Sequence, residues 1–432
     1  MKTITRYFGI LIMGLTVLAS CDSIDYPDRF KPTKGVPSIS YVRYADRDLI
    51  IDQASMEESI CIVGDNLKSV HELYFNDQPA VLNTSYITEH TLVVTVPKTL
   101  PTVQDDKMHF ITRDSSVVLY DFKVLPPVPR INAMSNEWAE SGETVTISGA
   151  YLFAPLEIQF PGVDPVAVTT SGGDSFDVVV PAGAQPGKVK VTTASGTAQS
   201  IFMYKDTRGM LFNFDDDPHP TNHGWHAQKV ETDDTALDGN FLRLGDPSVT
   251  LDANGGWNDG NFSFEYWPGD WDDPVTYADS PRLTDFVDFT AWKNMALKFE
   301  LYIPSSNPWK AGAMQLIVGG VDKITGGAAD AVDIDGNVLG GANNTFFNNT
   351  ELPRGMYVPW KETGSFDTGD KWITVVVPYT DFVYGFDGSK ASGELSAADF
   401  TSLTIFVWDG GTPGTDCQPV IKIDNIRAVP VK

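Results

Sequence analysis

The chain has 432 residues, enough for about two to four domains that each bury a hydrophobic core. It contains 31 Lys and Arg residues against 57 Asp and Glu residues, which gives a net charge of -26. Such an acidic surface repels phosphate backbones and anionic lipid headgroups, so we exclude nucleic acid as a partner and favour a neutral one. The three cysteines, Cys21, Cys61 and Cys417, do not form the pattern of a disulfide framework.

Residues 1–20 have the composition of an export signal. Lys2 and Arg6 precede an apolar stretch over residues 7–18, and small residues lead up to Cys21. The sequence Leu-Ala-Ser-Cys over residues 18–21 resembles the lipobox of bacterial lipoproteins. The resemblance implies an acylated Cys21 and a lipid anchor in the cell outer membrane, facing outside. The alternative is an ordinary signal peptide that has a cysteine at its cleavage site.

Two proline-containing segments divide the remainder of the chain. Residues 21–36 are polar, include Pro27 and Pro32 and lack hydrophobic periodicity, so they predict a tether. The second segment runs from Pro126 to Pro129, and its prolines predict a stiff, extended connection.

Two stretches of sequence resemble each other at a spacing of about 85 residues. In both, a β-branched run ends in glycine, and a leucine follows three residues later: Gly64 and Leu67 in the first, Gly149 and Leu152 in the second. Short apolar runs bounded by Gly, Pro and Asn predict small antiparallel sandwiches. The pattern is similar to the immunoglobulin-like IPT/TIG family, which implies two such spacer domains, at residues 37–125 and 128–205.

The composition changes after residue 205, and nine of the ten tryptophans lie in residues 208–432. The apolar runs in this segment, among them residues 295–303, 372–377, 403–408 and 421–426, have the length and alternation of strands. Together with the two spacer domains, they predict an all-β protein that ends in a larger jelly-roll β-sandwich.

The tryptophans of this last domain fall into two groups. Those in or beside predicted strands, Trp292 and Trp372, are interpreted as packing, and Trp408 is left between packing and binding. Five others lie among Gly, Pro, Asn and Asp, in loops that we expect to leave them exposed: Trp257, Trp267, Trp271, Trp309 and Trp360. Trp225, among histidines, is left unassigned. Exposed indoles flanked by polar side chains suit the apolar faces and the hydroxyls of a neutral sugar.

The domain order and several segments resemble Bacteroidetes surface glycan-binding proteins. The matching segments are residues 212–215, 302–309, 356–360, 372–375 and 423–427. The resemblance implies a non-catalytic outer-surface lipoprotein that binds a β-glucan such as xyloglucan or mixed-linkage glucan. It also implies an aromatic platform at Trp309, Tyr357 and Trp360, to which composition adds Trp267 and Trp271. The implied partners are an outer-membrane glycan importer and a surface endoglycanase.

Two other functions remain as alternatives. A surface glycoside hydrolase needs a pair of placed carboxyl groups, but the Glu-x-Asp-x-x-Glu strand motif of jelly-roll endoglucanases is absent. Motifs of serine hydrolases, P-loop enzymes and zinc proteases are absent too. The second alternative, an adhesin that binds a host protein, would need a large apolar surface.

No cofactor is required by this interpretation, but a structural calcium ion is one hypothesis. Asp215 near the start of the last domain and Asp424 near its end resemble the paired ends at which many carbohydrate-binding sandwiches hold calcium, a cation that prefers oxygen ligands. The sequence Asp-Ile-Asp-Gly-Asn at residues 333–337 is better explained as a turn, and His219, His223 and His226 as a loop cluster without zinc.

Overall fold

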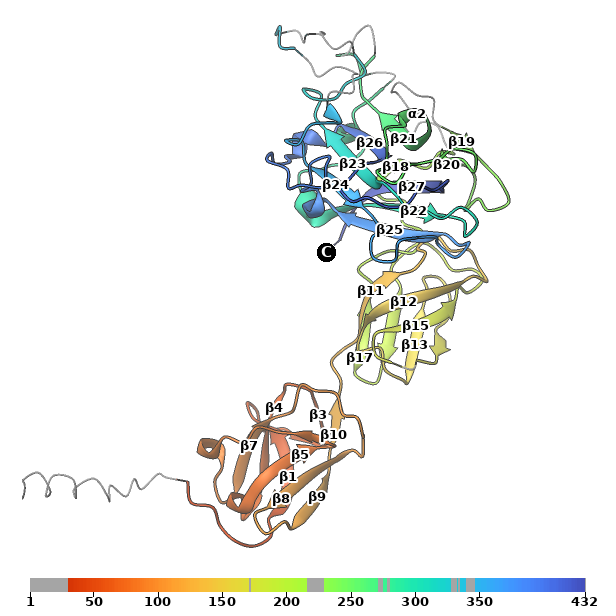
Figure 1. The fold of residues 1–432 in the computed structure, drawn as a ribbon. Coiled ribbons are helices and arrows are strands. Elements are labelled where there is room, and N and C mark those ends of the chain that lie inside the picture. The colour runs from red at the N-terminus through yellow and green to blue at the C-terminus, as the bar shows by residue number, and fades with distance from the viewer. Residues whose placement is uncertain are drawn as a thin grey trace, which may run out of the picture. The chain divides into compact units, whose positions relative to one another are not determined.

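The computed structural model describes residues 30–170, 172–215, 229–270, 275–277, 280–327, 332, 335–338 and 346–431. They divide into two compact units, one before and one after the junction of Pro127 and Val128. The described residues are almost entirely strands and loops, and the predicted all-β class is confirmed (Figure 1). Within these ranges, no helix has both the length and the apolar character needed to cross a membrane.

The first unit is an immunoglobulin-like sandwich of two four-stranded sheets. One sheet has the order β2-β1-β4-β7 and the other β6-β5-β8-β9, and a parallel pair, β3 and β10, lies beside them. The strands are β1 (Ser38–Tyr44), β2 (Ile50–Ile51), β3 (Gln53–Ser55), β4 (Ser59–Asp65), β5 (Val70–Phe75), β6 (Gln78–Pro79), β7 (Thr91–Thr95), β8 (Lys107–Thr112), β9 (Val117–Asp121) and β10 (Lys123–Leu125).

The second unit begins with another sandwich of this kind. Its sheets have the orders β11-β12-β15 and β14-β13-β16-β17. The strands are β11 (Arg130–Met134), β12 (Thr144–Ala150), β13 (Leu156–Gln159), β14 (Val166–Val168), β15 (Ser175–Val179), β16 (Lys190–Thr193) and β17 (Gly196–Gln199).

The repeated glycine and leucine have the same structural role in both sandwiches. Gly64 lies opposite Ile39, and Gly149 lies opposite Ile131, each beside a β-bulge in the partner strand. A Cβ atom on either glycine would overlap the backbone carbonyl of Ser38 or of Arg130, so only glycine fits. Three residues later, Leu67 and Leu152 are fully buried in the two cores.

The remainder of the second unit is a larger sandwich. Strands β19, β20, β27, β22 and β25 form one sheet in that order, with β18 paired to β27; the other sheet has the order β21-β26-β23-β24 (Figure 1). The strands are β18 (Met210–Phe212), β19 (Val230–Glu231), β20 (Phe241–Gly245), β21 (Ser263–Tyr266), β22 (Met295–Tyr302), β23 (Ala313–Gly319), β24 (Arg354–Tyr357), β25 (Ile373–Pro378), β26 (Ser402–Trp408) and β27 (Val420–Pro430). The short helices are α2 (Asp259–Phe262), η3 (Leu283–Asp285), η4 (Trp292–Asn294), η6 (Tyr379–Asp381) and η7 (Ala397–Asp399).

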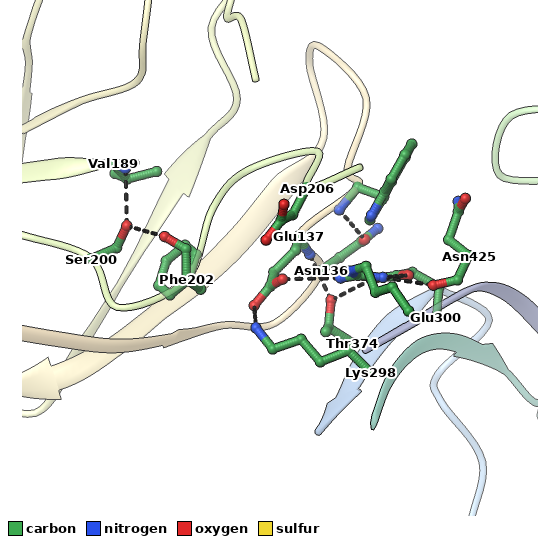
Figure 2. Close-up of polar contacts among 12 residues, drawn as sticks. Asn136, Glu137, Val189, Ser200, Phe202, Asp206, Lys298, Glu300, Thr374 and Asn425 are labelled. Atoms are coloured by element: carbon green, nitrogen blue, oxygen red, sulfur yellow. Dashed lines mark hydrogen bonds and ion pairs between the residues drawn. The ribbon is translucent and has the colours of Figure 1, made fainter. Parts of the chain in front are cut away.

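A buried polar cluster joins the second immunoglobulin-like domain to the larger sandwich. Glu137 accepts from Lys298 Nζ at 2.7 Å and from Arg427 Nη2 at 3.0 Å, and Arg427 also pairs with Glu300. The backbone N–H of Glu137 donates to Thr374 Oγ1 at 2.7 Å (Figure 2). Two cations face two carboxylates, so the cluster is neutral in sum, and it explains why the two domains form one compact unit. We call these five residues the joint.

Candidate functional site

The candidate site lies on the outer face of the sheet β21-β26-β23-β24. Side chains alternate along β26, so Leu403, Ile405 and Val407 enter the core between the sheets while Phe406 and Trp408 lie on the other face. Strand register places Gln315 of β23 beside Phe406 on this outer face.

Five aromatic side chains gather at the Trp408 end of this face, and we call them the aromatic patch: Trp257, Phe347, Phe386, Phe406 and Trp408. Trp257 meets Phe347, Phe406 and Trp408 edge to face, at centroid distances of 5.0–5.2 Å. Phe386 stacks on Trp408 at 5.4 Å, with only 9° between the ring planes. These are the preferred geometries of aromatic pairs, so the patch is a fixed surface.

Trp257 is the exposed member of the patch. Its exposed fraction is 37%, and the other tryptophans in the described ranges are buried or half-buried. The loop that holds it packs against the end of β26, where the N–H of Asp409 donates to the carbonyl of Gly255 at 2.8 Å. Gly255 has a positive φ of 64°, and a Cβ there would lie 2.7 Å from both the Asp409 nitrogen and the Gly312 Cα, so glycine permits this close approach.

A buried hydrogen-bond network supports the patch from below. Gln315 Nε2 donates to the carbonyls of Phe386 and Trp408 at 2.9 and 3.0 Å, and Gln315 Oε1 accepts from Arg354 Nη1 at 2.7 Å. Arg354 also donates to the carbonyl of Phe347 at 3.0 Å. Burial lowers the pKa of Arg354 to about 10, yet the group remains a cation at neutral pH. The network fixes the loops that present the rings.

The structure corrects the predicted aromatic platform. Trp309 and Trp267 have no exposed surface and Trp360 is 3% exposed, so none of them offers an open face to a sugar. The prediction that these loop tryptophans are exposed is wrong.

The physical reason is that each indole N–H finds an acceptor inside the domain. Trp309 donates to the Ala311 carbonyl, Trp360 to the Gly312 carbonyl, and Trp267 to Thr404 Oγ1, at 2.5–2.9 Å. With its N–H satisfied, an indole is buried at no polar cost, and its large apolar area favours the core.

Tyr357 is half-buried and lies beside Trp309, with 6.2 Å between the ring centroids. Burial raises the pKa of its hydroxyl to about 12. The structure therefore brings Trp309 and Tyr357 of the predicted platform together, but they pack against each other instead of forming an open binding surface. Trp271 and Cys21 lie outside the described residues, as do His219, His223 and His226.

The strand tryptophans pack as predicted. Trp372 is buried against Phe241 and Tyr302, and Trp292 is half-buried beside Phe400. Sequence reasoning placed Trp257 among the exposed loop tryptophans but left it out of the platform. Sequence reasoning gave no role to Gln315 of β23 or to Arg354 of β24. A polar residue within an otherwise apolar strand, such as Gln315 in β23, is a signal of a buried hydrogen-bond network.

Of the proposed calcium ligands, Asp424 lies on β27, a central strand of the six-stranded sheet, and Asp215 follows β18, which pairs with β27. Asp424 on β27 is fully buried, and its Oδ2 atom has no hydrogen-bond partner. Burial, followed by the nearby charge of Asp238, raises the pKa of Asp424 to about 9; burial also raises the pKa of Asp238. Asp215 is exposed and accepts from the Asn240 N–H at 2.5 Å. In the described ranges, no three His, Cys, Asp or Glu side chains are grouped closely enough to form a metal site by themselves.

The chain resembles known proteins in both sequence and structure. Residues 204–430 match the sequence model of the family described as "Surface glycan-binding protein B xyloglucan binding domain". The crystal structure of a surface glycan-binding protein from Prevotella bryantii, PbSGBP-B, is 43% identical, with a TM-score of 0.80; the match covers 92% of this chain and 100% of that one.

A curated relative from Bacteroides ovatus, named "IPT/TIG domain-containing protein", is 26% identical over 168 residues. The match covers 35% of this chain, and the chain spans about a third of the length of that relative.

Proposed function

Because this chain belongs to the surface glycan-binding protein B family, we propose that it captures a neutral β-glucan, either xyloglucan or mixed-linkage glucan, without cleaving it. The observation that supports this function most directly is the exposed ring of Trp257 on a rigid aromatic patch. A sugar ring stacks its C–H face on such a ring, while polar groups around it bond to the hydroxyls.

The electrostatics of the patch agree with binding rather than hydrolysis. A glycosidase acid must hold its proton near neutral pH, which requires a raised pKa. Asp238, Glu300 and Asp424 are carboxyl groups with a raised pKa, and all three lie within or beside the six-stranded sheet rather than at the patch. At the patch, Asp387 accepts from Ser389, which lowers its pKa, so this group is a poor proton donor.

Affinity gel electrophoresis tests this function on the chain from residue 22 onward. The gels contain xyloglucan, mixed-linkage β-glucan, laminarin, xylan or mannan. We expect retardation by one β-glucan and no release of reducing sugar from it. Retardation by none of these glycans contradicts β-glucan capture, and release of reducing sugar supports the hydrolase alternative.

We also propose that an acylated Cys21 anchors the protein in the outer membrane, facing outside, beside a glycan importer and a surface endoglycanase. The lipobox-like sequence over residues 18–21 supports the anchor, and the family supports the partners. Labelling of cells with a radioactive fatty acid tests the anchor, because Cys21→Ala should abolish incorporation. Co-purification of an importer with the membrane-bound chain tests the partnership.

A structural calcium ion is a second proposal, and the unpartnered Asp424 Oδ2 atom supports it. Asp424 and Asp238 are the residues that would hold the ion, which would neutralise two neighbouring carboxylates. We expect calcium to bind the EDTA-treated chain in isothermal titration and to raise its melting temperature, and we expect Asp424→Asn to abolish both effects. The absence of heat and of a shift in melting temperature would contradict calcium binding by this pair.

A further inference from the structure

A cavity of the larger sandwich lies beside η4 and η6. Its volume is about 420 Å³, within the range of small-ligand sites. The side chains that matter for its chemistry are Trp292, Lys293, Thr380, Lys390, Ser392 and Glu394. None of them belongs to the aromatic patch. We call this cavity the basic groove.

Local backbone structure brings these side chains together. Trp292 and Lys293 begin η4, and Thr380 lies in η6. Tyr384 bridges Lys390 as an antiparallel partner, and the Ala391 N–H donates to the Val383 carbonyl at 2.9 Å, which brings residues 390–394 alongside η6. The walls of the groove therefore come from backbone-bonded segments and are defined before any ligand binds.

Trp292 supplies the accessible ring of the groove. One side of the indole packs against Phe400, with 5.7 Å between the ring centroids, and the residue is only half-buried. Lys293 Nζ lies 5.5 Å from the indole centroid, at the distance of a cation–π contact. A ring with a cation at its face and hydroxyls nearby suits a sugar that has a negative group.

The two lysines of the groove lack carboxylate partners within the described part of the chain. Among the other lysines of this domain, Lys298, Lys323 and Lys422 each pair with an acidic residue. No such pair involves Lys293 or Lys390. Glu394 is the one carboxylate in the lining, so two positive charges and one negative charge leave the groove at +1 in a protein of net charge -26. Such a local excess of positive charge attracts an anion.

We infer that the basic groove is a second glycan site, one that takes the carboxylate of a uronic acid attached to a polysaccharide. The carboxylate would accept charge-assisted hydrogen bonds from the ammonium groups of Lys293 and Lys390, with its sugar ring beside Trp292. This site is separate from the aromatic patch, so it does not depend on neutral β-glucan capture.

A neighbouring cavity of about 280 Å³ gives the chain of such a glycan a path. It shares Thr380 and Val383 with the basic groove and is lined further along by Tyr357 and Tyr384. Tyr384 is exposed, so it offers an aromatic edge to neutral sugars that flank the acidic one.

Isothermal titration calorimetry tests the site with a xylo-oligosaccharide that has one glucuronic acid branch, and with its carboxyl-reduced form. We expect the acidic ligand to bind at least about tenfold more tightly, and the preference to disappear in the double variant Lys293→Gln/Lys390→Gln. The matched control is Lys361→Gln/Lys371→Gln, which removes two exposed lysines that do not line the groove and should keep the preference.

Glu394→Gln should increase the affinity of the groove for the acidic ligand, and a misfolded variant would not show such an increase. The substitution removes the one carboxylate of the groove, so it should raise the affinity for the acidic ligand about threefold or more while leaving the neutral ligand unchanged. Equal affinity for the two ligands, binding of neither, or a preference that survives in the Lys293/Lys390 double variant would overturn the inference. Binding of neutral β-glucan by the same variants reports separately on the aromatic patch.

Discussion

Arg427 of the larger sandwich and Glu137 of the domain before it form a buried ion pair, with 3.0 Å between Nη2 and Oε2. These residues are 290 positions apart in the sequence. Glu300 pairs with the other end of the same guanidinium, and burial raises the Glu300 pKa to about 6 even in its presence. The contact between the domains is therefore a charge network closed to water, which is costly to break from one side.

Replacing Glu137 with Gln should destabilise the second unit by about 3–5 kcal/mol, because it leaves Lys298 and Arg427 buried with a single carboxylate. Urea denaturation followed by tryptophan fluorescence measures the effect. Glu140→Gln is the matched control, since Glu140 is exposed where it pairs with Lys205, and it should cost about 1 kcal/mol or less. Similar losses for both variants would contradict the role of the joint.

Trp257→Ala should weaken binding of the captured β-glucan by about 10- to 100-fold, because it removes the exposed ring of the aromatic patch. Calorimetric titration measures the change. Phe286→Ala is the control: its ring has a similar exposed fraction, 39%, and it follows η3, which contacts the chain just before β26 at the end remote from Trp408. An unchanged affinity in Trp257→Ala would place the glycan elsewhere.

Trp309→Phe distinguishes a core residue from a binding residue. It removes the indole N–H that donates to Ala311 and leaves a small void, so we expect a loss of about 1–3 kcal/mol in unfolding free energy. The β-glucan affinity of the folded variant should stay within about twofold of the parent. A variant of unchanged stability that loses affinity would restore Trp309 to the binding surface.

Gln315→Leu tests whether the network under the patch organises it. The substitution removes the two donors that hold the carbonyls of Phe386 and Trp408 and the acceptor that faces Arg354. We expect a loss of stability of about 1–3 kcal/mol and weaker glucan binding, although Gln315 itself is buried. Glucan affinity equal to that of the parent would show that the rings hold their positions by packing alone.

The dependence of affinity on ionic strength tests whether stacking rather than charge drives glucan binding at the aromatic patch. Binding of a neutral glucan at the aromatic patch should change by less than about twofold between about 0.05 M and about 0.5 M NaCl, because no ion pairs form. A strong salt dependence of neutral glucan binding, measured by the same titration, would contradict a stacking mechanism.

The family and the all-β fold are confirmed, and both follow from local patterns in the sequence. Strand alternation in residues 403–408 predicts two faces, and the Gly64 and Gly149 repeat marks the same bulge in two domains. Such features depend on neighbours in sequence or on the steric needs of a single residue, so sequence reasoning reaches them.

The site was predicted less well, because burial of an indole depends on partners that are distant in sequence. Trp267 finds Thr404, 137 residues away, and Trp360 finds Gly312, 48 residues away. Gly, Pro and Asn around a tryptophan indicate a loop, but they do not indicate whether another segment covers it. Trp257 shows the opposite case, since it makes three T-shaped ring contacts and is still 37% exposed.

The joint also determines how the protein bears a load. A long polymer bound at the aromatic patch would pull on the larger sandwich. That tension would pass to the preceding domain through Glu137, Thr374 and their buried partners, because these contacts join the two domains directly. The second immunoglobulin-like domain and the larger sandwich would therefore respond to this tension as one unit. A fragment that begins after Glu137 would lose this coupling and would expose Lys298 and Arg427 to water.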